Sequence, residues 1–293
     1  MRKIVCYLLL VALMGIISAC RGPGIEFRNV PLNNVSDDID IAVMTPLPET
    51  PDYICSYRII KPDITCQYVT EYGAKFGIVG EPSNTNFGQM TMSNPEKDKI
   101  LHVYSETGAL EYNCPNKLFK VNPELPSDNE AIDIATNFLR GIGFLFLDID
   151  VENVVIGGST NGIPSHLLVK FTRTIDGFPI TGPGSKFGIR IGDEGEIVRV
   201  LVWHPEFEQA GEINIIEPYT AVNSLQTKKA YPAAPPDCKS IKIEDISLGY
   251  YLSSIDTYQQ YLTPAYIFRG KCYNGKGEYL QDYVSWVDAG TYP

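Results

Sequence analysis

The clearest pattern of alternating apolar and polar residues runs from Leu167 to Trp203. A period of two indicates strands with one dry face, and it occurs in three stretches, 167–172, 187–192 and 197–203. Turns that begin at Asp176-Gly177 and at Asp193 separate the stretches, and glycine accepts the positive φ that a tight hairpin needs. The sequence therefore predicts an antiparallel meander. Its dry face is set by Val169, Phe171, Phe187 and Ile189.

A helix is predicted just before this meander. Ser127 and Glu130 fit a capping box, in which the two residues satisfy each other's free backbone amides. The apolar residues that follow recur at helical spacing and form one face. They are Ala131, Ile134, Ala135, Phe138 and Leu139. Gly141 and Gly143 end the helix, and we expect its apolar face to lie across the meander.

The same order of elements, one helix and then strands, recurs before and after this segment at a spacing near 90 residues. The earlier copy has a strand at 53–60, a helix from an Asp63 N-cap to Phe76, and strands at 87–92, 100–104 and 109–112. The later copy has a helix from Thr220 to Ala230 and strands at 241–251, 261–269 and 279–287. The predicted fold class is α+β, with repeated modules of one helix packed on an antiparallel three- to four-stranded sheet. The predicted modules are 51–125, 126–215 and 216–293.

The first residues form a targeting segment. Arg2 and Lys3 precede the apolar run 4–17, which is too short to span a bilayer comfortably, and Ser18-Ala19-Cys20 follows. This order resembles a lipobox, the cleavage signal of prokaryotic lipoproteins. The resemblance implies a signal peptide at 1–19 and a lipid on Cys20 as the first mature residue. The alternative is an ordinary signal peptide or an uncleaved anchor, with Cys20 incidental.

Residues 20–50 carry many prolines and acidic residues without periodicity, which predicts a flexible tether. The whole chain has 24 Lys and Arg against 35 Asp and Glu, a formal charge of −11. Such a chain lacks the basic footprint of nucleic-acid-binding proteins, so a nucleic-acid partner is excluded.

The central segment, FTRTIDGFPITGPGSKFGIRIGDEGEIVRVLVWHP at 171–205, resembles PepSY-type and thermolysin-propeptide-type domains. In those domains, strands end in an acidic residue followed by glycine, and the last strand ends near a tryptophan. The segments 247–251 and 260–268 are similar to YycI/YycH-like extracytoplasmic regulatory proteins, with Tyr266 where tryptophan is usual. The resemblance covers roughly 127–290, with a fainter echo in 53–125. It implies a non-catalytic protein that inhibits or chaperones a peptidase or modulates a membrane-bound sensor kinase.

No motif in the sequence indicates catalysis, a metal or a cofactor. The three histidines, His102, His166 and His204, lie far apart and without ligand spacing, so structural or solvent roles are expected. The carboxylate pairs Asp148/Asp150 and Glu194/Glu196 are interpreted as solvated charge. We therefore expect a protein that is not an enzyme.

Five cysteines lie beyond Cys20, and pairs are plausible in an exported protein. Cys238 and Cys272 flank the first two strands of the third module and are the preferred disulfide. Cys55 is left to meet Cys66 or Cys114. The alternative is that all five are reduced, buried thiols.

Tyrosines are numerous, and most are expected in sheet packing. The segment Tyr258-Gln259-Gln260-Tyr261 is the best candidate for an exposed binding surface. The sequence thus predicts an extracytoplasmic, lipid-anchored membrane protein that regulates an envelope peptidase or sensor kinase through protein–protein interaction. Two alternatives stay open: a lipoprotein that binds a peptide or glycan in a tyrosine-lined groove, and a hydrolase of unrecognised type.

Overall fold

Strand pairing dominates the computed structural model, which describes residues 39–85, 87–145, 148–185, 187–227, 234–235 and 237–292. Thirteen strands of the described residues form one mixed sheet. They are β1 Asp40–Val43, β3 Ser83–Asn84, β4 Gln89–Ser93, β5 Ile100–Tyr104, β6 Leu110–Asn113, β7 Ile149–Thr160, β8 Ile163–Ile175, β9 Phe178–Thr181, β10 Phe187–Ile191, β11 Ile197–Val202, β13 Ser240–Tyr251, β14 Thr263–Tyr273 and β15 Tyr279–Asp288.

The large sheet has the order β15-β14-β13-β9-β8-β10-β11-β6-β5-β4-β3, with β7 paired to β8 and β1 paired to β13. A smaller sheet has the order β16-β12-β2, formed by Gly290–Thr291, Phe207–Ile215 and Tyr53–Ile59. The α-helices are α1 Cys66–Lys75, α2 Asp128–Ile142 and α3 Pro218–Gln226, and short 3-10 turns lie at η1 Pro183–Ser185 and η2 Asp193–Gly195.

The predicted fold class, repeated modules that each carry their own small sheet, is wrong. Antiparallel pairing of β6 with β11 joins the first predicted module to the second. Parallel pairing of β9 with β13, at Ile180–Tyr250 and Thr181–Tyr251, joins the second to the third. Isolated three- or four-stranded sheets would leave rows of unpaired backbone groups at their edges. Here those edges are used to build one continuous sheet.

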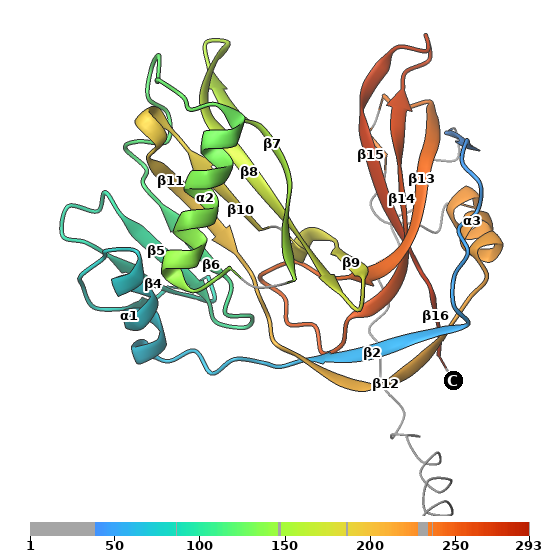
Figure 1. The fold of residues 1–293 in the computed structure, drawn as a ribbon, viewed down its shortest axis with the longest axis horizontal. Helices are drawn as coiled ribbons and strands as arrows, with labels where there is room; N and C mark the ends of the chain where they lie inside the picture. Colours follow the sequence, from blue (N-terminus) through green and yellow to red (C-terminus); the bar gives the residue numbers. More distant parts are fainter. Residues whose placement is uncertain are drawn as a thin grey trace, which may run out of the picture.

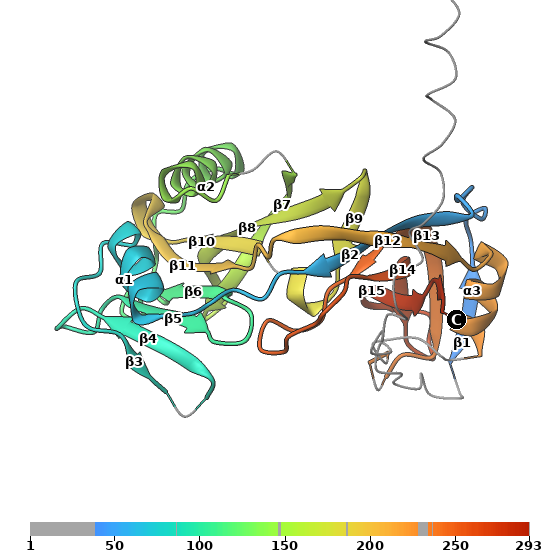
Figure 2. The same cartoon turned by 90° about the horizontal axis from the view of Figure 1, so that it is seen from below.

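The elements form two lobes (Figure 1). We call α1, α2, β3–β8, β10 and β11 the helical lobe, and α3, β1 and β13–β15 the C-terminal lobe. Strands β2 and β12 lie along the C-terminal lobe, share its core and lead toward the helical lobe, and β9 lies between the two lobes. Figure 2 shows the same arrangement from below. The Tyr250 hydroxyl donates a hydrogen bond to the Cys55 carbonyl at 2.7 Å, so a side chain of β13 is fixed directly to β2.

The helix predicted before the meander is confirmed in detail. Ser127 and Glu130 form the capping box, and the helix ends at Gly143, which has left-handed φ. Its apolar face packs in the core of the helical lobe against the predicted dry face of the meander. The fully or partly buried residues of that face are Ala131, Ile134, Ala135, Phe138 and Leu139.

Other local predictions need correction. Residues 40–43, in the predicted tether, form β1, and the buried side chains of Ile39 and Ile41 join the core of the C-terminal lobe. The short β-strand was hidden among acidic residues and prolines. Thr65, not Asp63, caps α1. The last helix begins with Pro218 after a Glu217 cap, not at Thr220, because proline suits the first turn of a helix.

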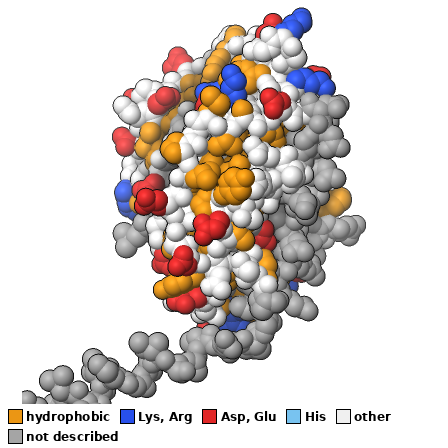
Figure 3. All heavy atoms as spheres, turned by 90° about the vertical axis from the view of Figure 1, so that its right-hand side faces the viewer, with side chains coloured by type: hydrophobic (Ala, Val, Ile, Leu, Met, Phe, Trp, Pro, Cys, Tyr) orange, Lys and Arg blue, Asp and Glu red, His pale blue; other side chains and the backbone are white. Residues whose placement is uncertain are grey.

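The C-terminal lobe exposes several large apolar side chains on the side that carries α3 and the chain leading to β2. Met44, Leu47, Tyr53 and Tyr219 are 44–65% exposed. Figure 3, which looks at this side, shows hydrophobic side chains across its middle with acidic side chains around them. Nothing in the described structure covers this surface.

The packing of α2 predicts unequal effects of two neighbouring substitutions. Leu139 is fully buried, whereas Phe138 is only partly buried. Leu139→Ala should lower the free energy of unfolding by about 3–5 kcal/mol, as in other buried leucines. Phe138→Ala should cost less, because its ring is partly in solvent already. Urea unfolding of both variants measures the difference, and a larger loss for Phe138→Ala would contradict this packing.

Candidate functional site

The helical lobe has one covered and one helix-free sheet face. Both α1 and α2 pack into a single core with the apolar residues of the strands. Because side chains alternate across a strand, the intervening residues face the other way. On this helix-free face they are mostly half-buried and polar. They include Thr91, His102, Glu111, Asn113, Arg199, Leu201, Gly188, Arg190, Leu168 and Lys170.

Strand register arranges these residues in two rows. One row crosses the sheet from Thr91 through His102, Glu111, Leu201 and Gly188 to Lys170. The adjacent row places Asn113 opposite Arg199, Arg199 opposite Arg190, and Arg190 opposite Leu168. The sheet thus brings together charges from segments far apart in the sequence.

A pocket of about 470 Å³ lies on the β8, β10 and β11 part of this face. Its lining combines cations, apolar side chains and one carboxylate. The residues are Glu152, Leu168, Lys170, Phe171, Ser185, Phe187, Gly188, Arg190, Arg199 and Leu201. Gly188 adds no side chain to the floor, and the Leu168 side chain packs against it, since a Cβ at Gly188 would lie 2.9 Å from Leu168 Cδ1.

Glu111 holds Arg199 at one side of the pocket. The Arg199 guanidinium donates a hydrogen bond to Glu111 Oε1, and Asn113 Nδ2 and the Tyr104 hydroxyl donate to the same carboxylate at 3.2 Å each. Burial would raise the pKa of Glu111, but the Arg199 charge and these hydrogen bonds hold it below its usual range. Glu111 is therefore a fixed anion that orients Arg199.

Arg190 is held by a histidine instead of a carboxylate. Its NH1 group lies 3.2 Å from His166 Nε2, and His166 Nδ1 lies 3.0 Å from the Ser165 hydroxyl. Burial, and then the charge of Arg190, lower the pKa of His166. The neutral ring accepts a hydrogen bond from Arg190 NH1. Burial and the neighbouring charge of Arg199 lower the pKa of the Arg190 guanidinium.

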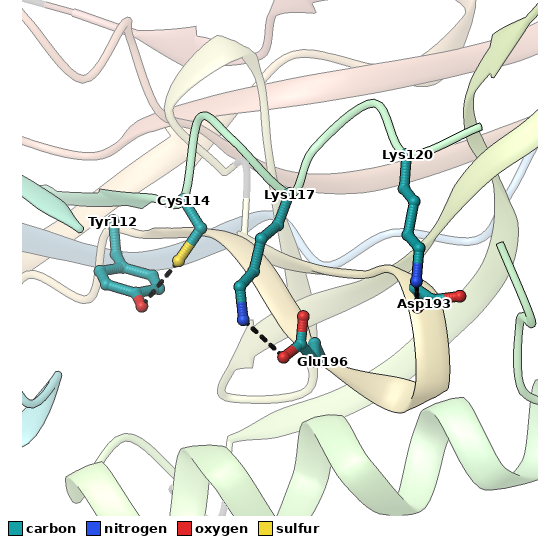
Figure 4. Close-up of polar contacts among 6 residues, drawn as sticks. All are labelled: Tyr112, Cys114, Lys117, Lys120, Asp193 and Glu196. Carbon is teal, nitrogen blue, oxygen red and sulfur yellow. Dashed lines mark hydrogen bonds and ion pairs between the residues drawn. The ribbon is translucent and has the colours of Figure 1, made fainter. Parts of the chain in front are cut away.

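The loop 117–120 covers His166 at one end of the helix-free face. Lys117 pairs with Glu196, and Lys120 pairs with Asp193 at the β10–β11 turn (Figure 4). Between these two clamps, the Phe119 ring meets the His166 ring edge-on at a centroid distance of 6.2 Å. Exposed ion pairs contribute little singly, but together they keep the loop over His166, whose side chain is fully buried.

Two pocket cations have no carboxylate partner among the described residues. In the described part of the chain, no Asp or Glu oxygen lies within ion-pairing distance of Lys170 or of Arg190. This contrasts with a chain whose formal charge is −11. The pocket is suited to hold negative groups that come from outside the described chain.

A second charged cluster lies at the junction of the lobes and fixes the chain there. Arg173 donates to Asp148 Oδ2 from Nε at 3.0 Å and from NH2 at 2.8 Å, and its guanidinium lies 4.9 Å from the Phe207 ring centre. His204 Nε2 lies 3.4 Å from Asp148 Oδ1. These contacts tie β8 to the start of β12. The two carboxylates that the sequence places close together therefore differ: Asp148 pairs with Arg173, and Asp150 is exposed.

The sequence-predicted site residues are elsewhere. Cys20 lies outside the described residues. In the segment 258–261, the Tyr258 hydroxyl donates to the Ile59 carbonyl at 3.1 Å, and Gln259 Nε2 donates to the Tyr261 carbonyl at 2.6 Å. Gln259 Oε1 also accepts from the Ser253 amide at 2.7 Å. These side chains are used to fold their own loop against β2, and the segment does not line the pocket.

Cys238 and Cys272 are brought together and are both buried. Each is a free thiol in this structure, as are the other described cysteines. Burial and then the hydrogen bond with Cys238 raise the pKa of Cys272 to about 12. Cys114 instead interacts with the Tyr112 hydroxyl at 2.9 Å, and Cys66 is exposed at the start of α1.

Sequence reasoning missed the pocket although a signal was present. Lys170, Arg190 and Arg199 occupy the polar positions of the alternating stretches whose apolar positions set the dry face. A cation at the polar, outward-facing position of each of three adjacent strands indicates a positively charged patch. Which strands were adjacent, however, followed only from the pairing.

Two further features of the described part of the chain concern metals and membranes. It contains no cluster of three or more His, Cys, Asp or Glu residues suited to hold a metal ion. None of its helices is both long and apolar enough to cross a membrane.

The buried histidines predict a loss of stability in mild acid. Burial is the main cause that lowers the pKa of His102, His166 and His204 below the unfolded value of about 6.5. Below about pH 6.5 the three histidines therefore take up protons when the chain unfolds. The stability that the neutral histidines contribute is complete above that pH and is lost as pH falls toward their folded pKa values. Urea unfolding at pH 7.5 and 5.5 should show lower stability at pH 5.5, and His166→Gln should reduce the difference. An unchanged difference in the variant would show that His166 is not involved.

The bridge between Cys238 and Cys272 stays a prediction. In protein exported to an oxidising compartment, we expect both thiols to resist alkylation in denaturant until a reductant is added. Cys66, which is exposed and far from them in the fold, is the internal control that should label without reductant. Equal labelling of all three residues before reduction would rule the bridge out.

Comparison with known proteins identifies the fold alone. No family model matches the chain, and no curated protein matches it. Among solved structures, it is similar to the crystal structure of an uncharacterized protein from Eubacterium rectale ATCC 33656. The two share 14% sequence identity and a TM-score of 0.50, and the match covers 88% of this chain and 91% of the other. A likeness at this identity shows a similar overall architecture.

Proposed function

We propose that this protein is a non-enzymatic binding protein of the cell envelope, anchored to the membrane through a lipid on Cys20. Its partner is an envelope protein, a peptidase or a sensor kinase, which docks on the helix-free face of the sheet. The observation that carries this proposal is the pocket on that face, where Lys170 and Arg190 have no carboxylate partner among the described residues.

The form of the face supports docking. Half-buried polar side chains here are held by one another, as in the network of Glu111 with Arg199, Asn113 and Tyr104. Such a surface is rigid before a partner arrives, so little side-chain freedom is lost on binding. Leu168 and Leu201 add apolar area beside the charges, as in the centre of many protein interfaces.

The sequence supports the location. The basic residues, apolar run and Ser18-Ala19-Cys20 stand in the order of a lipoprotein signal. A lipid on Cys20 leaves residues 20–38 before the described part, a length that spans at most about 65 Å when fully extended. The first described residue would then lie within that distance of the membrane that holds the partner.

A photoreactive amino acid in place of Leu201 tests the proposal in intact cells. We expect it to crosslink one membrane protein, because Leu201 lines the pocket. The same group in place of Phe87, which is 86% exposed outside the pocket, is the matched control and should not capture that protein. Adding Arg190→Gln to the Leu201 variant should abolish the product.

Two results would contradict the proposal. The same product from both positions, or a product that does not respond to Arg190→Gln, would show that the pocket is not the docking site. Fractionation of the same cells checks the anchor. Cys20→Ser should release the chain from membranes or leave the precursor unprocessed, and a wild-type chain found in the soluble fraction would remove the anchor from the proposal.

A further inference from the structure

The pocket has an excess of positive charge that the fold itself does not neutralise. Lys170, Arg190 and Arg199 line it, against the single lining carboxylate of Glu152. Glu111 does not line the pocket, and it accepts a hydrogen bond from Arg199. The pocket is therefore net positive in a chain with eleven more negative than positive charges.

The position of the two arginines is unfavourable without a ligand. Arg190 and Arg199 are directly opposite each other on β10 and β11. Like charges at such cross-strand positions destabilise a sheet. An anion that contacts both guanidinium groups would remove the repulsion, and guanidinium is the side chain best shaped for a carboxylate or phosphate.

The hydrogen bonds around the arginines leave donors for such an anion. Arg190 uses NH1 toward His166, and Arg199 uses NH2 toward Glu111. Each guanidinium has five N–H donors. The contacts on one side fix the two groups in place, and their remaining donors are available to a ligand in the pocket.

The spacing of the cations favours a ligand with two negative groups. Lys170 is opposite Gly188, which lies two residues before Arg190 on the same strand. With strands about 4.8 Å apart and a rise of about 3.3 Å per residue, the Cα atoms of Lys170 and Arg190 are about 8 Å apart. Alternate side chains of an extended peptide are separated by about 7 Å.

We propose that the pocket binds an extended acidic peptide segment whose two carboxylates, on residues separated by one other residue, meet Lys170 and the Arg190/Arg199 pair. This inference rests on the proposed function and names the part of the partner that enters the pocket. The intervening backbone passes over Gly188, which has no side chain of its own, and lies beside the Leu168 side chain that packs against this glycine. Leu168 and Leu201 contact the aliphatic parts of the ligand.

Binding of a synthetic peptide to the full-length chain tests the proposal. The probe is a six-residue peptide with glutamate at its second and fourth positions and uncharged residues elsewhere. Calorimetric titration at low ionic strength should give saturable binding, and it should weaken as salt screens the charges. Arg190→Gln and Lys170→Gln should each raise Kd about tenfold, since each removes a charge-assisted contact.

Three controls make the result specific. Lys271→Gln removes the same charge from an exposed lysine paired with Glu244 in the C-terminal lobe, and its Kd should equal that of the wild type. The same peptide with glutamine in place of glutamate should not bind. Inorganic phosphate at equal concentration should bind more weakly, because it is too small to reach both ends of the cation array.

The outcomes separate this inference from the docking proposal. No binding of the glutamate peptide, or equal loss in Lys271→Gln, overturns the acidic-peptide assignment. Phosphate that binds as tightly as the peptide also overturns it, in favour of a simple anion site. If crosslinking from Leu201 still depends on Arg190 in either case, docking stands and only the chemistry of the ligand is wrong. Peptide binding without such crosslinking supports the ligand class and removes the proposed partner.

Discussion

Backbone pairing at strand edges is the constraint on which this structure depends. A helix on a small antiparallel sheet can bury an apolar face, but it leaves two edges with unpaired amide and carbonyl groups. Here β6 pairs with β11 and β9 pairs with β13, so the edges of locally formed hairpins become interior positions of a larger sheet. The pairing of β1 with β13 follows the same rule. Strand β9 pairs only with the end of β13, at Tyr250 and Tyr251, and β1 pairs with the start of β13, at 240–243.

The continuous sheet has a consequence for the surface. In the helical lobe, α1 and α2 share one core and lie on one side of the strands. Every apolar residue sent to that side places its neighbour on the other side. The polar residues of the neighbouring strands β4, β5, β6, β11, β10 and β8 therefore lie on a single face. Charges that would be scattered over separate modules, such as Glu111 and Arg199, become neighbours in one hydrogen-bonded network.

The sequence predicted local elements well because their causes are local. The capping box at Ser127 and the apolar face of α2 depend on residues within two or three turns of one another. The strands of the meander follow from alternation alone. The overall fold depends on pairings between distant segments, such as Ile180 with Tyr250, and no pattern in a single stretch specifies its partner. The pocket was missed for the same reason, since Lys170 and Arg199 meet only through β10.

The charges of the chain and of the pocket act at different ranges. At physiological ionic strength, charges separated by more than about 8 Å are largely screened. The formal charge of −11 would repel an acidic partner, and screening keeps this repulsion weak at a distance. Within the pocket, however, Arg190 is half-buried and meets a ligand with less intervening solvent. Recognition of an acidic segment would then depend on close fit, not on long-range steering. An acidic surface with one basic pocket accepts a matching segment and disfavours acidic proteins in general.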